Sequence, residues 1–172
     1  MALHESFRPE AEVMKAPPDF GVRSDYEIER NKPMPSLNHS SIQTNLVMEL
    51  VPFRHQFRIA SELSLSLSNW PSVPDICIYP KMPINLGEDV TAMTEPPLCA
   101  IEIISPSQSV DEMREKAEKY FAHGVQSCWI VIPAFANIYV YSSPDEYEIY
   151  RAHETLQDAV LGIAIPLKEV FE

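Results

Sequence analysis

Apolar residues recur at helical spacing in two stretches of the chain, and the first predicts a helix over about 38–53. Asn38 is the N-cap candidate, and Pro52 falls in the last turn, where a proline shortens the helix. His39 lies in the first turn and Glu49 on the flank of the apolar stripe, so both are most simply interpreted as solvated helix residues. The stripe itself comprises Ile42, Leu46, Leu50 and Phe53.

The second helical stretch has clearer boundaries. Ser109 and Glu112 have the S-x-x-E spacing of a capping box, and Gly124 stands where helices commonly end. On a helical wheel Lys116 lies beside Tyr120 at the edge of the apolar face, whereas the neighbouring charged residues point outward. Lys116 can therefore bend toward a site under this helix, or else extend its stem over the edge of the core. The apolar face comprises Met113, Ala117, Tyr120 and Phe121.

The remaining patterns are those of strands. Residues 57–69 (FRIASELSLSLSN) alternate leucine with serine, which predicts one half-buried strand. A turn at 69–71 then leads into 75–79, which is expected to be its hairpin partner. The polar stretch 81–96 predicts a long loop that could form a flap. Further strands are expected at AIEII, SCWIVIP, ANIYVYSS and EYEIYRA, and the apolar tail LGIAIPLKEVF is expected to dock on the domain.

The domain organisation follows from composition. Residues 1–22 are polar and proline-rich without periodicity, which predicts a flexible arm, and 25–33 predict a short edge hairpin. Residues 23–172 suit a single mixed globular domain. The first residues lack the apolar core of a signal peptide, and no apolar run approaches the ~20 residues of a membrane span. A soluble, cytoplasmic protein is therefore expected, with Cys77, Cys99 and Cys128 as buried free thiols.

The charge balance bears on partners. The chain has 13 basic and 25 acidic residues and a net charge of −12. Duplex-binding proteins usually present a basic face, because neutralising phosphates supplies much of their affinity. The overall charge therefore counts against tight binding of nucleic acid, although it leaves room for a local basic rim.

Two acidic residues interrupt strongly apolar strands. Asp75 follows Pro74 at the start of one strand, and Glu102 lies between Ile101 and Ile103 in the next. An ionised carboxylate on a buried strand costs several kcal/mol unless a cation or hydrogen-bond donors lie beside it. A divalent metal between the two acids would meet that need. The alternative is that each acid lies at a strand end in water or pairs with an arginine.

In this order the elements resemble the Uma-type restriction endonuclease family, within the PD-(D/E)XK nuclease superfamily. The resemblance covers about residues 25–150. It rests on DYEIERNKP, NHSSIQTNL, SELSLSL, PDICIY, AIEIISPSQS, the series Asp111, Lys116 and Tyr120, and GVQSCWIVIP. It implies an α/β (α+β) fold with a restriction-endonuclease-like core, in which a mixed β-sheet is flanked by helices.

The resemblance also implies a site. Asp75, Glu102 and the backbone carbonyl of Ile103 would bind Mg²⁺ or Mn²⁺, and the catalytic set would be Asp75, Glu102 and Lys116. The bound metal would polarise the scissile phosphate of DNA and lower the pKa of an attacking water. A lysine would position that water and offset charge in the transition state.

The sequence departs from the superfamily pattern at one position. Ile104 stands where the E-x-K motif has its lysine, so the resemblance implies that the lysine has moved to the helix as Lys116. Glu62, His39, Tyr120 and Glu49 are the supporting residues that the resemblance suggests. Two functions remain open: an endonuclease, for which a homodimer would bring two sites to two strands, and a weakly active or inactive binding or regulatory module. Ile104 and the net charge favour the second, and the retained acids and Lys116 favour the first.

Overall fold

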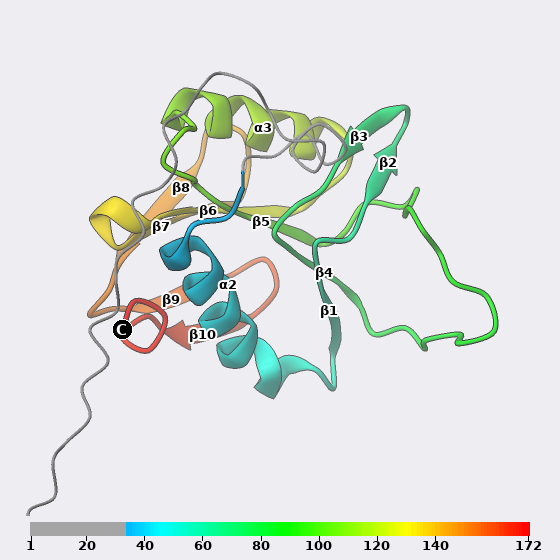
Figure 1. Cartoon of the computed structure of the whole chain (residues 1–172), viewed down its shortest axis with the longest axis horizontal. Coiled ribbons are helices and arrows are strands. Elements are labelled where there is room, and N and C mark those ends of the chain that lie inside the picture. Colours follow the sequence, from blue (N-terminus) through cyan, green and yellow to red (C-terminus); the bar gives the residue numbers. More distant parts are fainter. Residues whose placement is uncertain (1–33) are drawn as a thin grey trace, which may run out of the picture.

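The computed structural model describes residues 34–172, and the predicted arm and edge hairpin lie outside this part of the chain. A six-stranded mixed sheet forms its centre, in the order β1-β4-β5-β6-β7-β8 (Figure 1). The strands are β1 (Phe57–Ser61), β4 (Ile76–Pro80), β5 (Cys99–Ile103), β6 (Ser127–Ile132), β7 (Asn137–Tyr141) and β8 (Tyr147–Arg151). Neighbours pair antiparallel except β5 and β6, which are parallel and joined by a helix. The predicted mixed sheet with flanking helices is confirmed.

Helix α2 (Leu37–Leu50) covers one face of the sheet (Figure 1). Its buried residues are spaced three or four apart, so one side of the helix enters the core between the sheet and the hairpin of β9 (Thr155–Asp158) and β10 (Ile163–Pro166). The N-cap is Ser36, whose hydroxyl accepts from the N–H of His39, and not Asn38 as predicted. The helix ends at Leu50 because Pro52 follows in a 3-10 turn, η1 (Val51–Phe53).

Helix α3 (Val110–Ala122) covers the opposite face together with the hairpin of β2 (Leu65–Leu67) and β3 (Trp70–Ser72) (Figure 1). The predicted capping box is present: Ser109 accepts from the N–H of Glu112, and the Glu112 carboxylate accepts from the N–H of Ser109. Gly124 has a φ of 93°, the left-handed conformation expected at this position. The predicted boundaries of this helix are therefore confirmed.

The long alternating stretch does not form one strand as predicted. It divides at Glu62, where φ is 56° and the chain changes direction. The first part, β1, pairs with β4, with Ile59 opposite Ile78. The second part, β2, pairs instead with β3. The predicted pairing of 57–69 with 75–79 is therefore confirmed for the first part of the stretch and wrong for the second. The alternation of leucine and serine correctly predicts which side chains are buried in β2, but it carries no information about where a strand breaks.

The C-terminal segment docks on the α2 face as predicted. Several of its apolar residues are buried there: Leu156, Ile163, Ile165, Leu167 and Val170. The polar residue that fixes this segment is Asp158, whose Oδ2 accepts from Ser127 Oγ at 2.6 Å and from Trp129 Nε1 at 2.8 Å. Its Oδ1 accepts from the backbone N–H groups of Val160 and Leu161.

The three cysteines are buried and free, as the sequence predicts. Within residues 34–172, no helix is both long and apolar enough to cross a membrane.

Candidate functional site

Asp75 directly precedes β4 and lies at the meeting point of three elements, with an exposed fraction of 1%. Its Oδ2 accepts from the backbone N–H of Ile103 in β5 at 2.7 Å. Its Oδ1 lies 3.2 Å from His39 Nε2 of α2. Its backbone carbonyl accepts from the N–H of Glu62 at 3.1 Å. The Ile103 N–H and the His39 ring offset the cost of burying the carboxylate.

His39 reaches the site from the first turn of α2 and is 6% exposed, so its interpretation as a solvated residue is wrong. Its Nδ1 lies 3.3 Å from Ser105 Oγ, just after β5. The neutral tautomer that satisfies both contacts has the proton on Nε2, which donates to Asp75, while Nδ1 accepts from Ser105. The ring is thus held at both nitrogens.

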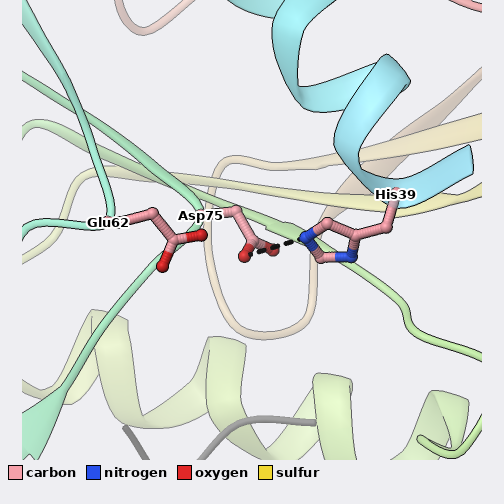
Figure 2. A group of neighbouring side chains, drawn as sticks. All are labelled: His39, Glu62 and Asp75. Atoms are coloured by element: carbon pink, nitrogen blue, oxygen red, sulfur yellow. Dashed lines mark ion pairs between the residues drawn. The ribbon is translucent and has the colours of Figure 1, made fainter. Parts of the chain in front are cut away.

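Glu62 lies at the end of β1, on the other side of Asp75 from His39 (Figure 2). Its Oε1 accepts from Gln43 Nε2 at 3.3 Å, and the same amide nitrogen donates to the Asp75 carbonyl at 2.8 Å. Gln43 follows His39 by four residues in α2, so both side chains leave the same face of the helix. One turn of α2 therefore holds both flanks of Asp75.

The three side chains fit a divalent metal ion when the His39 proton moves to Nδ1, because Nε2 then offers its lone pair to the ion and Nδ1 donates to Ser105. Among residues 34–172, His39, Glu62 and Asp75 are the one group of three or more potential ligands whose ligand atoms all lie within 4.8 Å of one another. Ligand atoms contact divalent ions at about 2.0–2.5 Å, so one ion between them can reach all three. The two carboxylates suit hard ions such as Mg²⁺ and Mn²⁺, and the imidazole is typical of borderline ions such as Zn²⁺.

A second cluster surrounds Glu102 in β5, on the side of α3. Glu102 is 2% exposed, and its Oε1 lies 2.7 Å from Lys116 Nζ. The same oxygen accepts from the Tyr120 hydroxyl at 2.5 Å, and Ser72 Oγ lies 2.7 Å from that hydroxyl. Burial, and then the neighbouring Glu102 carboxylate, raise the pKa of Tyr120 well above its ordinary value. Tyr120 therefore stays protonated, and its hydroxyl donates a hydrogen bond to Glu102.

The two clusters adjoin across the β4–β5 pair. Ile76 pairs with Ile101, which places Asp75 and Glu102 at neighbouring positions on adjacent strands. Ile103 links them, because it follows Glu102 and donates its N–H to Asp75. Glu102 is nevertheless not a member of the three-residue ligand group, and it contacts Lys116 and Tyr120 of α3.

Residues 17–168 match the Uma2 family, whose description is "putative restriction endonuclease". The chain belongs to this family. The crystal structure of a putative nuclease belonging to DUF820 from Anabaena variabilis is similar to it, with a TM-score of 0.67 and 26% sequence identity over 81% of this chain and 83% of that one. No curated protein matches the chain. The resemblance drawn from the sequence is therefore confirmed.

The Uma2 chain thus brings most of the predicted site residues into two adjoining clusters. Glu49 is the exception: it lies ten residues beyond His39 in α2, a separation of ~15 Å along the helix. Ile104, which stands in place of the motif lysine, packs against the α3-side core. Lys116 reaches Glu102 from α3, as the helical wheel suggested.

Three contributors of this Uma2 chain were missed in the sequence: Gln43, Ser72 and Ser105. Uncharged polar residues carry no signature of their own. For Gln43 a signal existed, because it follows His39 at a spacing of four. For His39 the signal was its spacing of three from Ile42, which continues the apolar stripe toward the N-terminus.

Proposed function

We propose that this Uma2-family protein is a divalent-metal-dependent endonuclease that hydrolyses phosphodiester bonds in DNA. The observation that carries the proposal is the approach of His39, Glu62 and Asp75 ligand atoms to within 4.8 Å of one another, beside Glu102 and Lys116. Buried acids cluster in this way at a cost that a bound cation offsets. Membership of a family described as restriction endonucleases suggests DNA as the substrate.

Asp75 is the residue common to both candidate ligand sets. The set expected from the sequence adds Glu102 and the Ile103 carbonyl, and the set supported by proximity adds Glu62 and His39. In an extended strand the N–H and C=O of one residue point to the same side. The Ile103 carbonyl is therefore expected to face Asp75, as its N–H does. When bound there, a divalent ion supplies Lewis-acid activation of the phosphate and of water.

The remaining polar residues of the site have supporting roles in the proposal. In the ligand set expected from the sequence, His39 does not bind the metal but, held between Asp75 and Ser105, fixes the orientation of the Asp75 carboxylate. Lys116 is the ammonium that stands in for the lysine missing at Ile104, and it would stabilise negative charge on the phosphate in the transition state. Tyr120 keeps Glu102 oriented by donating a hydrogen bond to its carboxylate.

A second candidate is a nuclease-fold module that binds or regulates without cleaving. It is favoured by the short contact between Lys116 and Glu102, which occupies the ammonium with a neighbouring carboxylate. The net charge of −12 favours it as well.

Plasmid nicking by the purified full chain tests the proposal. With Mg²⁺ or Mn²⁺ the wild type should convert supercoiled DNA to the open circle, and EDTA should stop this. Asp75→Asn should abolish nicking, while Asp145→Asn, which removes an exposed acid far along the chain, should not. Nicking that survives in Asp75→Asn would assign the activity to a contaminant and remove the support for the proposal.

Calorimetric metal titration separates the two ligand sets. Weakened binding in Glu62→Gln with little change in Glu102→Gln would select His39, Glu62 and Asp75, and the reverse would select the set expected from the sequence. A wild type that binds neither ion favours the non-catalytic module. A homodimer belongs to the proposal because it brings two sites to two strands, and light scattering of the purified chain tests it.

A further inference from the structure

Three cations lie together at the corner of the sheet where η1 leads into β1 and where β4 ends. Arg54 caps η1, Arg58 lies in β1, and Lys81 directly follows β4. Strands β1 and β4 lie side by side and antiparallel, so that β1 begins and β4 ends at this corner (Figure 1). We call Arg54, Arg58 and Lys81 the basic corner.

The basic corner is held together by backbone carbonyl groups. Lys81 Nζ donates to the Arg54 carbonyl at 2.7 Å, and the Lys81 N–H donates to the Gln56 carbonyl at 3.0 Å. Arg58 donates to the Met82 carbonyl through both Nε and Nη2, at 3.3 and 2.7 Å. A carbonyl orients a cation without neutralising it. Within residues 34–172 the ion pairs of lysine and arginine are Arg114–Glu118, Lys116–Glu102 and Lys168–Glu172, so the corner keeps its positive charge.

The two segments that form the basic corner contain no acidic residue, although the chain as a whole is strongly acidic. Residues 50–61 contain Arg54, His55 and Arg58 and no acidic residue. Residues 76–87 contain Lys81 and again no acidic residue. Arg54, His55 and Lys81 are exposed and Arg58 is partly exposed, so their charges are open to a ligand. The first acids after Lys81 in the sequence are Glu88 and Asp89.

The corner is connected to the candidate metal site by a single strand. Arg58 and Glu62 are four residues apart along β1 and its end, a distance of ~13 Å at ~3.3 Å per residue. One DNA strand advances ~3.4 Å along the helix axis per phosphate, so this span corresponds to about four nucleotides. A strand whose phosphate lies at Glu62 and Asp75 can therefore continue over the basic corner.

We propose that Arg54, Arg58 and Lys81 form the surface that contacts the DNA backbone a few nucleotides from the cleavage site. This inference rests on the proposed function, since DNA is the partner that function supplies. The surface contacts phosphates and not base edges, so it adds affinity without sequence preference. It is also the local basic rim that a net charge of −12 makes necessary, because the rest of the chain repels DNA.

Fluorescence anisotropy with a short labelled DNA duplex tests the surface. The measurement uses the full chain in the Asp75→Asn background, so that cleavage does not disturb it. Removing Arg54 and Lys81 together (Arg54→Ala/Lys81→Ala) should weaken binding by about tenfold or more near 0.1 M salt and should reduce the slope of log K against log salt by about two. Arg54→Lys/Lys81→Arg, which keeps both charges, should retain the wild-type slope.

Lys119→Ala/Lys168→Ala is the matched control, because it removes the same charge from exposed positions elsewhere. Equal weakening in this control would reduce the effect to net charge and overturn the surface. Unchanged binding by Arg54→Ala/Lys81→Ala would also overturn it, and would leave the nuclease proposal intact if the wild type nicks DNA. Selective weakening in a protein that never nicks supports the surface and overturns the nuclease proposal. Wild-type binding to anionic phospholipid vesicles but not to DNA would overturn it in favour of a membrane contact.

Discussion

The carboxylate of Asp75 accepts a hydrogen bond of 2.7 Å from the backbone N–H of Ile103, a residue 28 positions later in the chain. The contact joins the start of β4 to the end of β5 and places an acid where two strands and α2 meet. It also means that Asp75 supports the fold as well as the proposed chemistry.

Asp75→Ala should therefore lower the free energy of unfolding by about 1.5–3 kcal/mol, because the buried Ile103 N–H and the His39 ring both lose a charged acceptor. Asp75→Asn should cost less, since its amide oxygen can still accept from Ile103. Urea unfolding followed by circular dichroism measures both. An Ala variant as stable as the wild type would contradict this role, and Asp145→Ala, at an exposed position, should change little.

Lys116 should contribute to stability through Glu102. Lys116→Met keeps most of the apolar stem but leaves the buried Glu102 carboxylate without its ammonium, so we expect a loss of about 1.5–3 kcal/mol. The side chain of Lys116 is 20% exposed, so the lower part of that range is expected. Lys119→Met, in the same helix but exposed, is the control and should be nearly neutral. Equal stabilities of the two variants in urea would show that the contact contributes nothing.

The buried thiols should make the protein sensitive to alkali. Burial raises the pKa of the Cys77 thiol from 9.0 to about 12, and burial also raises the pKa of Cys99 and Cys128. Above pH ~9 the unfolded chain releases thiol protons that the folded chain retains, so stability is full below this pH and falls as pH rises toward the folded pKa. Each such thiol contributes up to ~1.4 kcal/mol per pH unit.

Cys77→Ala should accordingly flatten the decline of the unfolding free energy between about pH 9 and 11, measured by urea unfolding at several pH values. Ser66→Ala changes an exposed residue and removes no titratable group, so its slope should match the wild type. A Cys77→Ala slope equal to that of the wild type would mean that this thiol ionises alike in both states.

Asp158 should be among the most costly acids to replace. Four donors converge on its carboxylate: Ser127, Trp129 and two backbone N–H groups of the following turn. Asp158→Ala leaves the Ser127 and Trp129 donors buried without an acceptor, so we expect a loss of about 3–5 kcal/mol. Asp158→Asn should cost less but still be destabilising, because its amide N–H₂ would face the indole N–H, which is also a donor. Thermal unfolding measures the order Ala, Asn, wild type, and a reversed order would contradict this account.

The fold could be predicted where short-range periodicity decides it. The capping box at Ser109 and the left-handed glycine at Gly124 are local features, and the structure has them as expected. The break between β1 and β2 could not be predicted in this way. It depends on the change of direction at Glu62, which ends β1 after Ser61, so that the first part of the stretch pairs with β4 and the second with β3.

Some of the site residues could likewise be predicted from the sequence, and others could not. Asp75 and Glu102 stand out in the sequence because charge inside apolar runs is unusual. Lys116 stands out because the helical wheel places it at the edge of the apolar face, and the structure places all three residues in adjoining clusters. The burial of His39 and the role of Ser105 depend on contacts between residues 66 positions apart, which no local pattern encodes. Glu49 was suggested by resemblance alone, and the helix carries it away from the site.

The backbone of Glu62, with its φ of 56°, has one more consequence. A left-handed conformation costs a residue with a Cβ of this kind about 1–2 kcal/mol, and glycine or asparagine would occupy it more easily. Glu62 therefore makes the bend at a higher conformational cost than glycine or asparagine would. In return, the bend carries an acidic side chain directed at Asp75 (Figure 2). Replacing Glu62 by glycine should thus raise the stability of the protein but remove one of the three candidate metal ligands, as expected where a strained residue serves function.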